Sequence, residues 1–420
     1  MYKLQTLPNG VRLLTVPMPA TQTFTILVMV ATGSRYESRA LNGISHFLEH
    51  MFFKGTAKRP SAFAISSALD KVGGEFNAFT SKEYTGYYAK VDGAHALLAL
   101  DVIADILLHS KFERREIERE RGVILEEINM YENNPILHIE DLFESCLYGD
   151  TPAGWDTIGT KANVKNFSRN DFLSYWRSHY QSRNLVIALA GRFHSKDASI
   201  SKKFFREIPA GAKNKTIISL RPQTTPALKV KEQKTQQTNL SIGVRAYSYF
   251  DSNYPTLKLL GIILGASMSS RLFIAVRERR GLAYQVHTNV EGYADSGYLT
   301  TNIGASADKI EAAVKVVLLE YRRIAKELVS AAELKKAKDY FKGKVALQLE
   351  SSENMASWFS RQAVLGLPLL TAKEHIEEIM RVSRTDVKRV ANQIFQNNGL
   401  NLAVIGYRIN TGGLTKILKI

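Results

Sequence analysis

The segment His46-Phe47-Leu48-Glu49-His50 has the residue types and spacing needed for metal-assisted hydrolysis. It lies in an apolar stretch, residues 44–53, with helical character, so His46 and His50 project from the same face about one turn apart. Glu49, three residues after His46, projects close to that face. Two imidazoles can bind zinc, and a neighbouring carboxylate can serve as a base toward water. The order H-x-x-E-H is the inverse of the commoner H-E-x-x-H motif.

The motif alone leaves a simpler reading open, in which two exposed or core histidines flank a glutamate by chance. The other histidines have no partner at ligand spacing, and we expect them to be structural or exposed. They are His95, His109, His138, His179, His194, His287 and His375.

A catalytic zinc site needs a third protein ligand and one position left for water. One helical stripe in the segment 113–147 is acidic: Glu113, Glu116, Glu120 and Glu127. A solvated acidic face is a sufficient explanation for the first two. Glu127 follows an apolar run, residues 122–125, so its neighbours are expected to be buried, and a buried carboxylate needs a partner such as a cation.

The elements that position these residues belong to a duplicated chain. A Ser-capped helix followed by a buried strand ending in Gly occurs at 168–191 and again at 383–406, an offset of 215 residues. The strand 23–30 has a counterpart at 238–245. The same offset carries His46 to Gly261 and His50 to Gly265, so the second half lacks the histidines.

This repeat predicts two homologous α/β halves of the α+β class, each a mainly antiparallel sheet with helices on one face. We expect an N-terminal metal-binding domain over 1–215, a linker over 216–236 and a C-terminal domain without metal ligands over 237–420. In the first half, we expect a helix over 61–72, a hairpin over 76–91 and helices over 94–108 and 113–147, the last broken near 133–135.

Composition excludes several classes of protein. The single cysteine, Cys146, rules out a disulfide within the chain and a four-cysteine zinc site. No signal peptide or membrane-length apolar run is visible, so we expect a cytoplasmic protein that does not bind membranes. The net charge of +16 is dispersed and lacks the aromatic interleaving of a nucleic-acid module, so we expect solvated helix faces and no nucleic-acid partner.

Beyond the motif, the chain resembles the pitrilysin/insulinase family of zinc metallopeptidases, the inverzincins. Within it, the similarity is to the branch that contains the catalytic subunit of mitochondrial processing peptidase and its bacterial homologues. The matching segments are His46–Thr56, Asn77–Ser81, Tyr87–Lys90 and Glu118–Glu127 in the first half, and Leu272–Tyr284 in the second.

The resemblance implies roles for individual residues. His46, His50 and Glu127 would bind Zn²⁺, Glu49 would be the general base and Glu120 a supporting acid. Glu126 competes with Glu127, but the two lie about 100° apart around a helix, so only one can face the metal.

Other matched residues concern the substrate. Asn77, Ala78 and Phe79 would lie on an edge strand that pairs with an extended peptide, although Asn77 could also be an ordinary strand-end residue. Arg277 and Tyr284 would reach across an interdomain cleft to hold the scissile peptide. Without the resemblance, they read as a helix-surface arginine and a packed tyrosine.

The predicted activity is therefore zinc-dependent endoproteolysis of peptides or unfolded segments. A second hypothesis is a non-catalytic partner or scaffold subunit, because the same family contains degenerate members. Those members typically lose motif residues, whereas this chain keeps them. Chains of this length in the family commonly pair, so we expect a homodimer.

Overall fold

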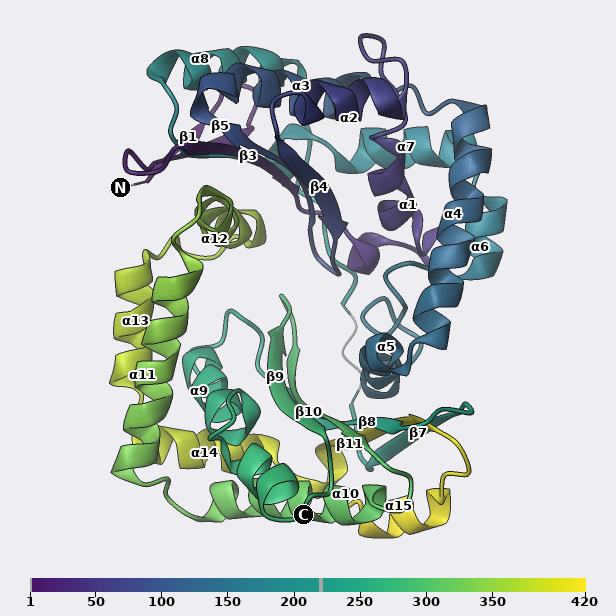
Figure 1. Ribbon diagram of the computed structural model, residues 1–420, viewed down its shortest axis with the longest axis vertical. Coiled ribbons are helices and arrows are strands. Elements are labelled where there is room, and N and C mark those ends of the chain that lie inside the picture. The colour runs from purple at the N-terminus through teal and green to yellow at the C-terminus, as the bar shows by residue number, and fades with distance from the viewer. Residues whose placement is uncertain (1, 219–221) are drawn as a thin grey trace. The chain divides into compact units, whose positions relative to one another are not determined.

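The computed structural model describes residues 2–218 and 222–420, and it separates into two compact units (Figure 1). The first unit comprises Met1–Ile128, Asp156–Ile217 and Ala346–Leu370, and the second comprises Asn129–Trp155, Ile218–Val345 and Thr371–Ile420. Each unit contains one sheet with packed helices, which confirms the α+β class.

The sheet of the first unit has six strands in the order β1-β2-β6-β3-β5-β4. Neighbours are antiparallel except for β2 and β6, which are parallel. The strand at one edge is β4, which the predicted hairpin joins to β5. The strands are β1 (Lys3–Thr6), β2 (Arg12–Pro17), β3 (Thr23–Val30), β4 (Glu75–Thr80), β5 (Thr85–Asp92) and β6 (Leu185–Gly191).

Most helices of the first unit share one core with one face of this sheet, and α12 packs against the other face through β3 and β6 (Figure 1). The first core includes Phe47 of α1, Leu100 of α3 and Ile124 of α4. The helices are α1 (Ile44–Met51), α2 (Ala62–Asp70), α3 (Ala96–His109), α4 (Arg114–Asn133), α6 (Lys161–Asn166), α7 (Arg169–His179), α8 (Ser195–Phe204) and α12 (Ser352–Leu365).

The second unit repeats this plan with five strands in the order β7-β11-β8-β10-β9, matching β2-β6-β3-β5-β4 in both order and direction. Its strands are β7 (Ala227–Glu232), β8 (Thr238–Ala246), β9 (Gln285–Gly292), β10 (Gly297–Ala305) and β11 (Leu400–Gly406). Its helices are α5 (Pro135–Tyr148), α9 (Tyr254–Gly265), a π-helix over Phe273–Glu278, α10 (Ile310–Lys326), α11 (Ala331–Gln348), α13 (Ala372–Arg381), α14 (Arg384–Ile394) and α15 (Thr411–Ile417). The expected duplication is confirmed, because α7 and α14 both begin with capping boxes at an offset of 215 residues, from Ser168 and Ser383.

Each repeat supplies one helix that packs on the sheet of the other repeat. Helix α5, encoded with the first half, packs on β11 and β8, and α12, encoded with the second half, packs on β3 and β6. The prediction placed helices on one face of each sheet only. In the structure, one further helix covers the opposite face of each sheet: α12 in the first unit and α5 in the second. The predicted domain boundaries at 215 and 237 follow the repeat in the sequence. The compact units differ from the predicted domains mainly because α5 belongs to the second unit and α12 to the first.

The predicted linker, 216–236, is not a simple connection. It contains β7, which pairs in parallel with β11 and forms an edge of the second sheet. The short segment Ala227–Glu232 forms this strand despite its polar composition. Among the described residues, β7 pairs with a strand on one side only, and an edge strand tolerates polar side chains. Residues 219–221 of the predicted linker lie outside the described residues.

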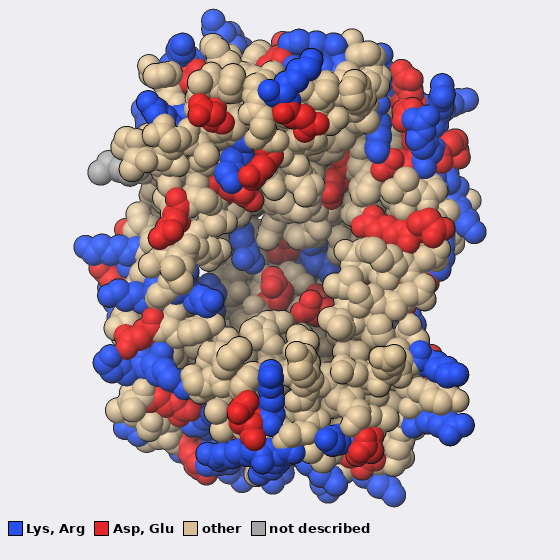
Figure 2. Space-filling view, viewed as in Figure 1, with Lys and Arg blue, Asp and Glu red and all other residues tan. Residues whose placement is uncertain are grey.

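Basic and acidic side chains are interspersed on the face shown in Figure 2, in agreement with the dispersed charge expected from the sequence. Among the described residues, no helix combines the length and apolar character needed to cross a membrane.

Candidate metal centre

Helix α1 carries the H-x-x-E-H motif and divides its side chains between core and site. Phe47, Leu48 and Met51 are buried, whereas His46, Glu49 and His50 are only partly buried. The helix begins at Gly43, which has a φ of 99° and therefore a conformation that a glycine adopts without strain. A Cβ at this position would lie 2.7 Å from the carbonyl oxygen of Ile158, so both the turn and the packing require glycine.

The N-terminus of α1 has an unusual cap. Gly43 has no side chain to offer, and the buried carboxylate of Glu37, six residues upstream, accepts hydrogen bonds from the backbone N–H groups of Gly43 and Ser45, each at 2.8 Å. Burial raises the pKa of Glu37, and these hydrogen bonds oppose that rise. An acceptor at this end satisfies free N–H groups and complements the helix dipole, which fixes the position of the short helix.

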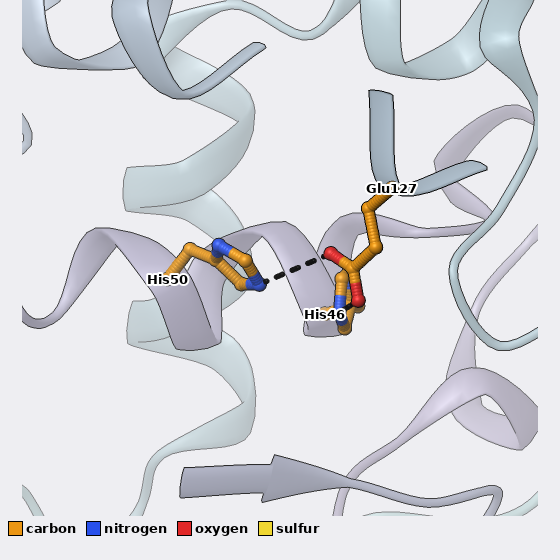
Figure 3. Close-up of side chains that lie close together, drawn as sticks. All are labelled: His46, His50 and Glu127. Atoms are coloured by element: carbon orange, nitrogen blue, oxygen red, sulfur yellow. Dashed lines mark ion pairs between the residues drawn. The ribbon is translucent and has the colours of Figure 1, made fainter. Parts of the chain in front are cut away.

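Three potential metal ligands converge beside α1 (Figure 3). His46 Nε2 lies 3.7 Å from Glu127 Oε1, and His50 Nε2 lies 3.6 Å from Glu127 Oε2. One donor atom from each residue lies within 4.8 Å of the other two, which is compatible with a single ion between them. Glu127 comes from α4, so the cluster joins two helices that are about 75 residues apart in the chain.

The electrostatics of the cluster suit a cation. Burial and the neighbouring His50 lower the pKa of His46 to about 3, which keeps its imidazole neutral and its lone pair free. Burial also raises the pKa of Glu127, so its carboxylate lacks a full compensating charge. In the described residues, His46 Nδ1 is buried without a hydrogen-bond partner. Two imidazoles and one carboxylate are a donor set that zinc accepts, so these residues fit the ion.

His50 is oriented by a second carboxylate. Its Nδ1 lies 2.8 Å from Glu120 Oε1, and the other oxygen of Glu120 lies 2.6 Å from the ammonium of Lys54. Burial alone would lower the pKa of His50, but the hydrogen bond and charge of Glu120 raise it above its ordinary value. A histidine ligand whose other nitrogen bonds a carboxylate has a fixed ring orientation and a more basic donor atom.

Glu49 lies beside the cluster and points toward the sheet. Its Oε2 accepts a hydrogen bond of 2.5 Å from the hydroxyl of Thr80, the last residue of β4. Burial raises the pKa of Glu49, against the effects of Thr80 and His50. A carboxylate with a raised pKa beside a hydrolytic site is suited to exchanging protons.

The other sequence-predicted residues of the first unit have distinct positions. Glu126 is exposed, whereas its competitor Glu127 is half-buried and faces the histidines. Asn77 is exposed on the edge strand β4, and its Oδ1 accepts a hydrogen bond of 2.9 Å from the backbone N–H of Ala78. Phe79 packs on the opposite face of the sheet from Ala78, among the apolar residues that contact α12.

Arg277 and Tyr284 belong to the second unit, near the start of the edge strand β9. The guanidinium carbon of Arg277 lies 5.2 Å from the centre of the Tyr284 ring and 4.9 Å from that of Phe273, distances typical of cation–π contacts. Tyr284 is 73% exposed, so it is not the packed tyrosine of the simpler reading.

Comparison with known proteins identifies the family. Residues 12–161 match the pattern described as "Insulinase (Peptidase family M16)", and residues 166–341 match "Peptidase M16 inactive domain". The chain is 36% identical to the uncharacterized zinc protease YmxG of Bacillus subtilis, over 94% of this chain and 96% of that protein. The chain belongs to peptidase family M16. Its cofactor is zinc, which the cluster of His46, His50 and Glu127 could hold.

Further proteins are similar to this chain in sequence or in fold. The uncharacterized zinc protease SCO5738 of Streptomyces coelicolor is 34% identical over 96% of this chain and 88% of its own length. A protease from Helicobacter pylori has the same fold, with a TM-score of 0.91 and 23% identity over 97% of this chain and 99% of that chain. A peptidase M16 inactive domain from Pseudomonas fluorescens also has the same fold, with a TM-score of 0.90 and 20% identity over 97% of this chain and 98% of that chain.

Three residues at this site were not found from the sequence: Glu37, Lys54 and Thr80. Lys54 and Thr80 lie within matched segments, but no spacing rule predicts their contacts with Glu120 and Glu49. Glu37 and Thr80 come from segments outside α1, and only the folded chain brings their side chains to it.

Proposed function

We propose that this M16 protein is a zinc-dependent endopeptidase that hydrolyses peptides or unfolded polypeptide segments. The observation that carries the proposal is the convergence of His46, His50 and Glu127, with the carboxylate of Glu49 beside them. This arrangement provides three ligands and one base, as a hydrolytic zinc site requires.

His46, His50 and Glu127 would hold the zinc ion, which when bound polarises the scissile carbonyl and makes water more acidic. Glu49 accepts a proton from the attacking water and later donates it to the leaving amine. Glu120 holds the His50 ring in place through Nδ1, and Lys54 keeps Glu120 ionised by its adjacent charge.

The substrate would add a strand to the free edge of β4. Within the part of the chain that the structure describes, β5 is the one strand that pairs with β4, so backbone groups on the other side of β4 are available to an extended peptide. The backbone N–H of Ala78 is held by the Asn77 side chain, which must release it when a peptide binds there. We also propose that Phe79 supports this strand from its other face and that Arg277 and Tyr284 contact the substrate from the second unit.

Replacing Glu49 by Gln tests the proposal. The variant keeps the shape of the side chain but cannot accept the proton, so peptide cleavage should fall at least about a hundredfold while zinc stays bound. Metal analysis and cleavage of a quenched fluorescent peptide library, with and without a chelator, provide the measurements.

Glu126→Gln is the matched control, because Glu126 is the exposed neighbour of Glu127 and should be dispensable. Full chelator-sensitive activity in Glu49→Gln would disprove the assignment of the base. Absence of activity from the zinc-loaded wild-type protein would disprove the peptidase.

A non-catalytic partner subunit is the second candidate, favoured by the description of the pattern that matches residues 166–341 as an inactive domain. Against it, the first half retains both histidines and Glu127 in one cluster, and it keeps Glu49 within the motif. Zinc-loaded wild-type protein that binds but never cleaves peptides would support this alternative. Homodimerisation and a cytoplasmic location remain expectations, which sedimentation analysis and cell fractionation would test.

A further inference from the structure

We propose that Thr80 is a positioning residue that orients the base Glu49 and ties it to the strand that receives the substrate. The inference rests on the proposed peptidase function. The last residue of β4 would thus orient the base, a role distinct from the pairing of the strand backbone with a peptide.

The contact itself is direct. Thr80 Oγ1 donates to Glu49 Oε2 at 2.5 Å, in the range of charge-assisted hydrogen bonds. Among the residues that the structure describes, the Thr80 hydroxyl is the one hydrogen-bond donor to the Glu49 carboxylate. A glutamate has three rotatable bonds, so this single donor selects one of many orientations of the carboxylate.

The donor is held rigidly. Thr80 pairs with Thr85 across the hairpin, and Ser81 closes the turn with a backbone hydrogen bond of 2.9 Å to the carbonyl of Tyr84. A β-branched threonine in a strand has few side-chain rotamers, so fixing its backbone largely fixes its hydroxyl.

The segment 33–37 braces both partners of this contact. The backbone N–H of Arg35 donates to the carbonyl of Lys82 at 2.9 Å, and its guanidinium pairs with Glu83 at 2.7 Å, which anchors the hairpin. Two residues later, Glu37 caps the helix that carries Glu49. The distance between Thr80 and Glu49 is therefore set from both sides by one short, buried segment.

The same strand is the proposed docking edge for substrate. Side chains alternate along β4, and Phe76 and Ala78 share with Thr80 the face toward the core that contains α1. A peptide that pairs with the edge of β4 therefore orders the strand whose last side chain holds the base. Misplacement of a catalytic group by about 1 Å can cost about a hundredfold in rate, so this link affects turnover more than binding.

Thr80→Val tests the role, because valine keeps the shape and removes the hydroxyl. We expect kcat to fall about ten- to a hundredfold while KM and zinc affinity, measured by chelator competition, change less than about twofold. Thr80→Ser restores a hydroxyl and should recover kcat to within about threefold of wild type.

Thr85→Val is the matched control. Thr85 lies opposite Thr80 in the same hairpin, and its hydroxyl donates to the carbonyl of Thr32 rather than to Glu49. The Thr85→Val variant should lower the melting temperature without lowering kcat. If Thr80→Val keeps wild-type kcat, or if Thr85→Val loses as much, Thr80 has no positioning role. If Thr80→Val fails to fold, Thr80→Cys can be used instead, because cysteine is similar in size and its thiol is a weak donor. We then expect kcat to be at least about fivefold lower than in the wild type.

A second measurement does not depend on activity. Cobalt(II) in place of zinc gives visible absorption bands that respond to groups around the metal. We expect Glu49→Gln and Thr80→Val to shift these bands in the same direction and Thr80→Ser and Thr85→Val to leave them unchanged. Unshifted bands in Thr80→Val, with a shift in Glu49→Gln, would overturn the inference even if the wild-type protein cleaved no peptide.

Discussion

Helix α1 of the first unit and helix α9 of the second occupy the same place in the repeat but contact their edge strands differently. At the offset of 215 residues, His46 and His50 correspond to Gly261 and Gly265. A Cβ on Gly261 would lie 2.8 Å from Val290 Cγ2, and one on Gly265 would lie 2.7 Å from the backbone nitrogen of Thr288. Strand β9 therefore packs directly on α9, where the first unit has two imidazoles.

The difference extends to the second helix of each site. Glu120 and Glu127 on α4 correspond at the same offset to Lys335 and Lys342 on α11, and Glu49 corresponds to the buried Leu264. The second unit thus has glycines in place of the two histidines and lysines in place of Glu120 and Glu127. The backbone of β9 fills the space that the imidazoles occupy in the first unit. Among the described residues, only the first unit therefore combines metal donors with a helix whose neighbouring strand leaves room for two imidazole side chains.

The largest expected effect comes from making α1 resemble α9. His46→Gly or His50→Gly removes one ligand of three, so zinc affinity should fall more than about a hundredfold and peptide cleavage should be lost. His50→Ala separates this loss from the cost of a helical glycine, which is about 1 kcal/mol. Isothermal titration with zinc measures the affinity, and His109→Ala, on a half-exposed histidine, is the control. Stoichiometric zinc in these variants would contradict the assigned ligands.

The converse change should damage the second unit without affecting the site. Gly265→Ala places a methyl group against the backbone of Thr288, which cannot move without disturbing β9, so we expect a loss of about 2–4 kcal/mol in the free energy of unfolding. Zinc affinity and kcat should not change. Gly343→Ala on α11 should instead be neutral or slightly stabilising in denaturant titrations, because no described atom outside the local helix backbone would lie within 4 Å of the added methyl group. Equal stability of the two variants would contradict the close packing of β9.

The two helices also begin differently. Glu37→Gln removes a charged acceptor from the N-terminus of α1 and faces an amide N–H₂ toward a backbone N–H, so we expect a loss of about 2 kcal/mol and weaker zinc binding. Asn253→Ala at the N-cap of α9, which makes no side-chain cap, should cost less than about 0.5 kcal/mol. Denaturant titration of the zinc-free protein distinguishes these outcomes, and equal losses would show that Glu37 is not a cap.

The smallest effect concerns acid sensitivity. Because folding lowers the pKa of His46 from 6.5 to about 3, the unfolded chain binds more protons within that window. The stability contributed by neutral His46 is thus lost as the pH falls below 6.5, by about 2 kcal/mol between pH 7 and 5. Zinc-free His46→Gln should lose about that much less stability than wild type over this range. Parallel stability curves of the two proteins would contradict the buried, neutral state of His46.

Much of the fold was predictable because its signals are local. The helix over 61–72, the hairpin over 76–91 and the helix break near 133–135 all appear in the structure at nearly the expected positions. The repeat was visible because Ser168 and Ser383 begin equivalent helices before equivalent strands. The exchange of α5 and α12 was not predictable, because the sequence of an amphipathic helix does not specify which of two similar sheets it covers.

The sequence by itself determined that two histidines share one helical face and that a glutamate lies close to it, because residues three and four apart are neighbours on every α-helix. It also determined that the second half lacks those histidines. The family resemblance already favoured Glu127 over Glu126 and gave Glu120 a supporting role. Only the tertiary structure decided that Glu120 contacts His50 together with Lys54 and that Thr80 holds Glu49. These contacts join distant segments, and their geometry depends on packing that no local periodicity encodes.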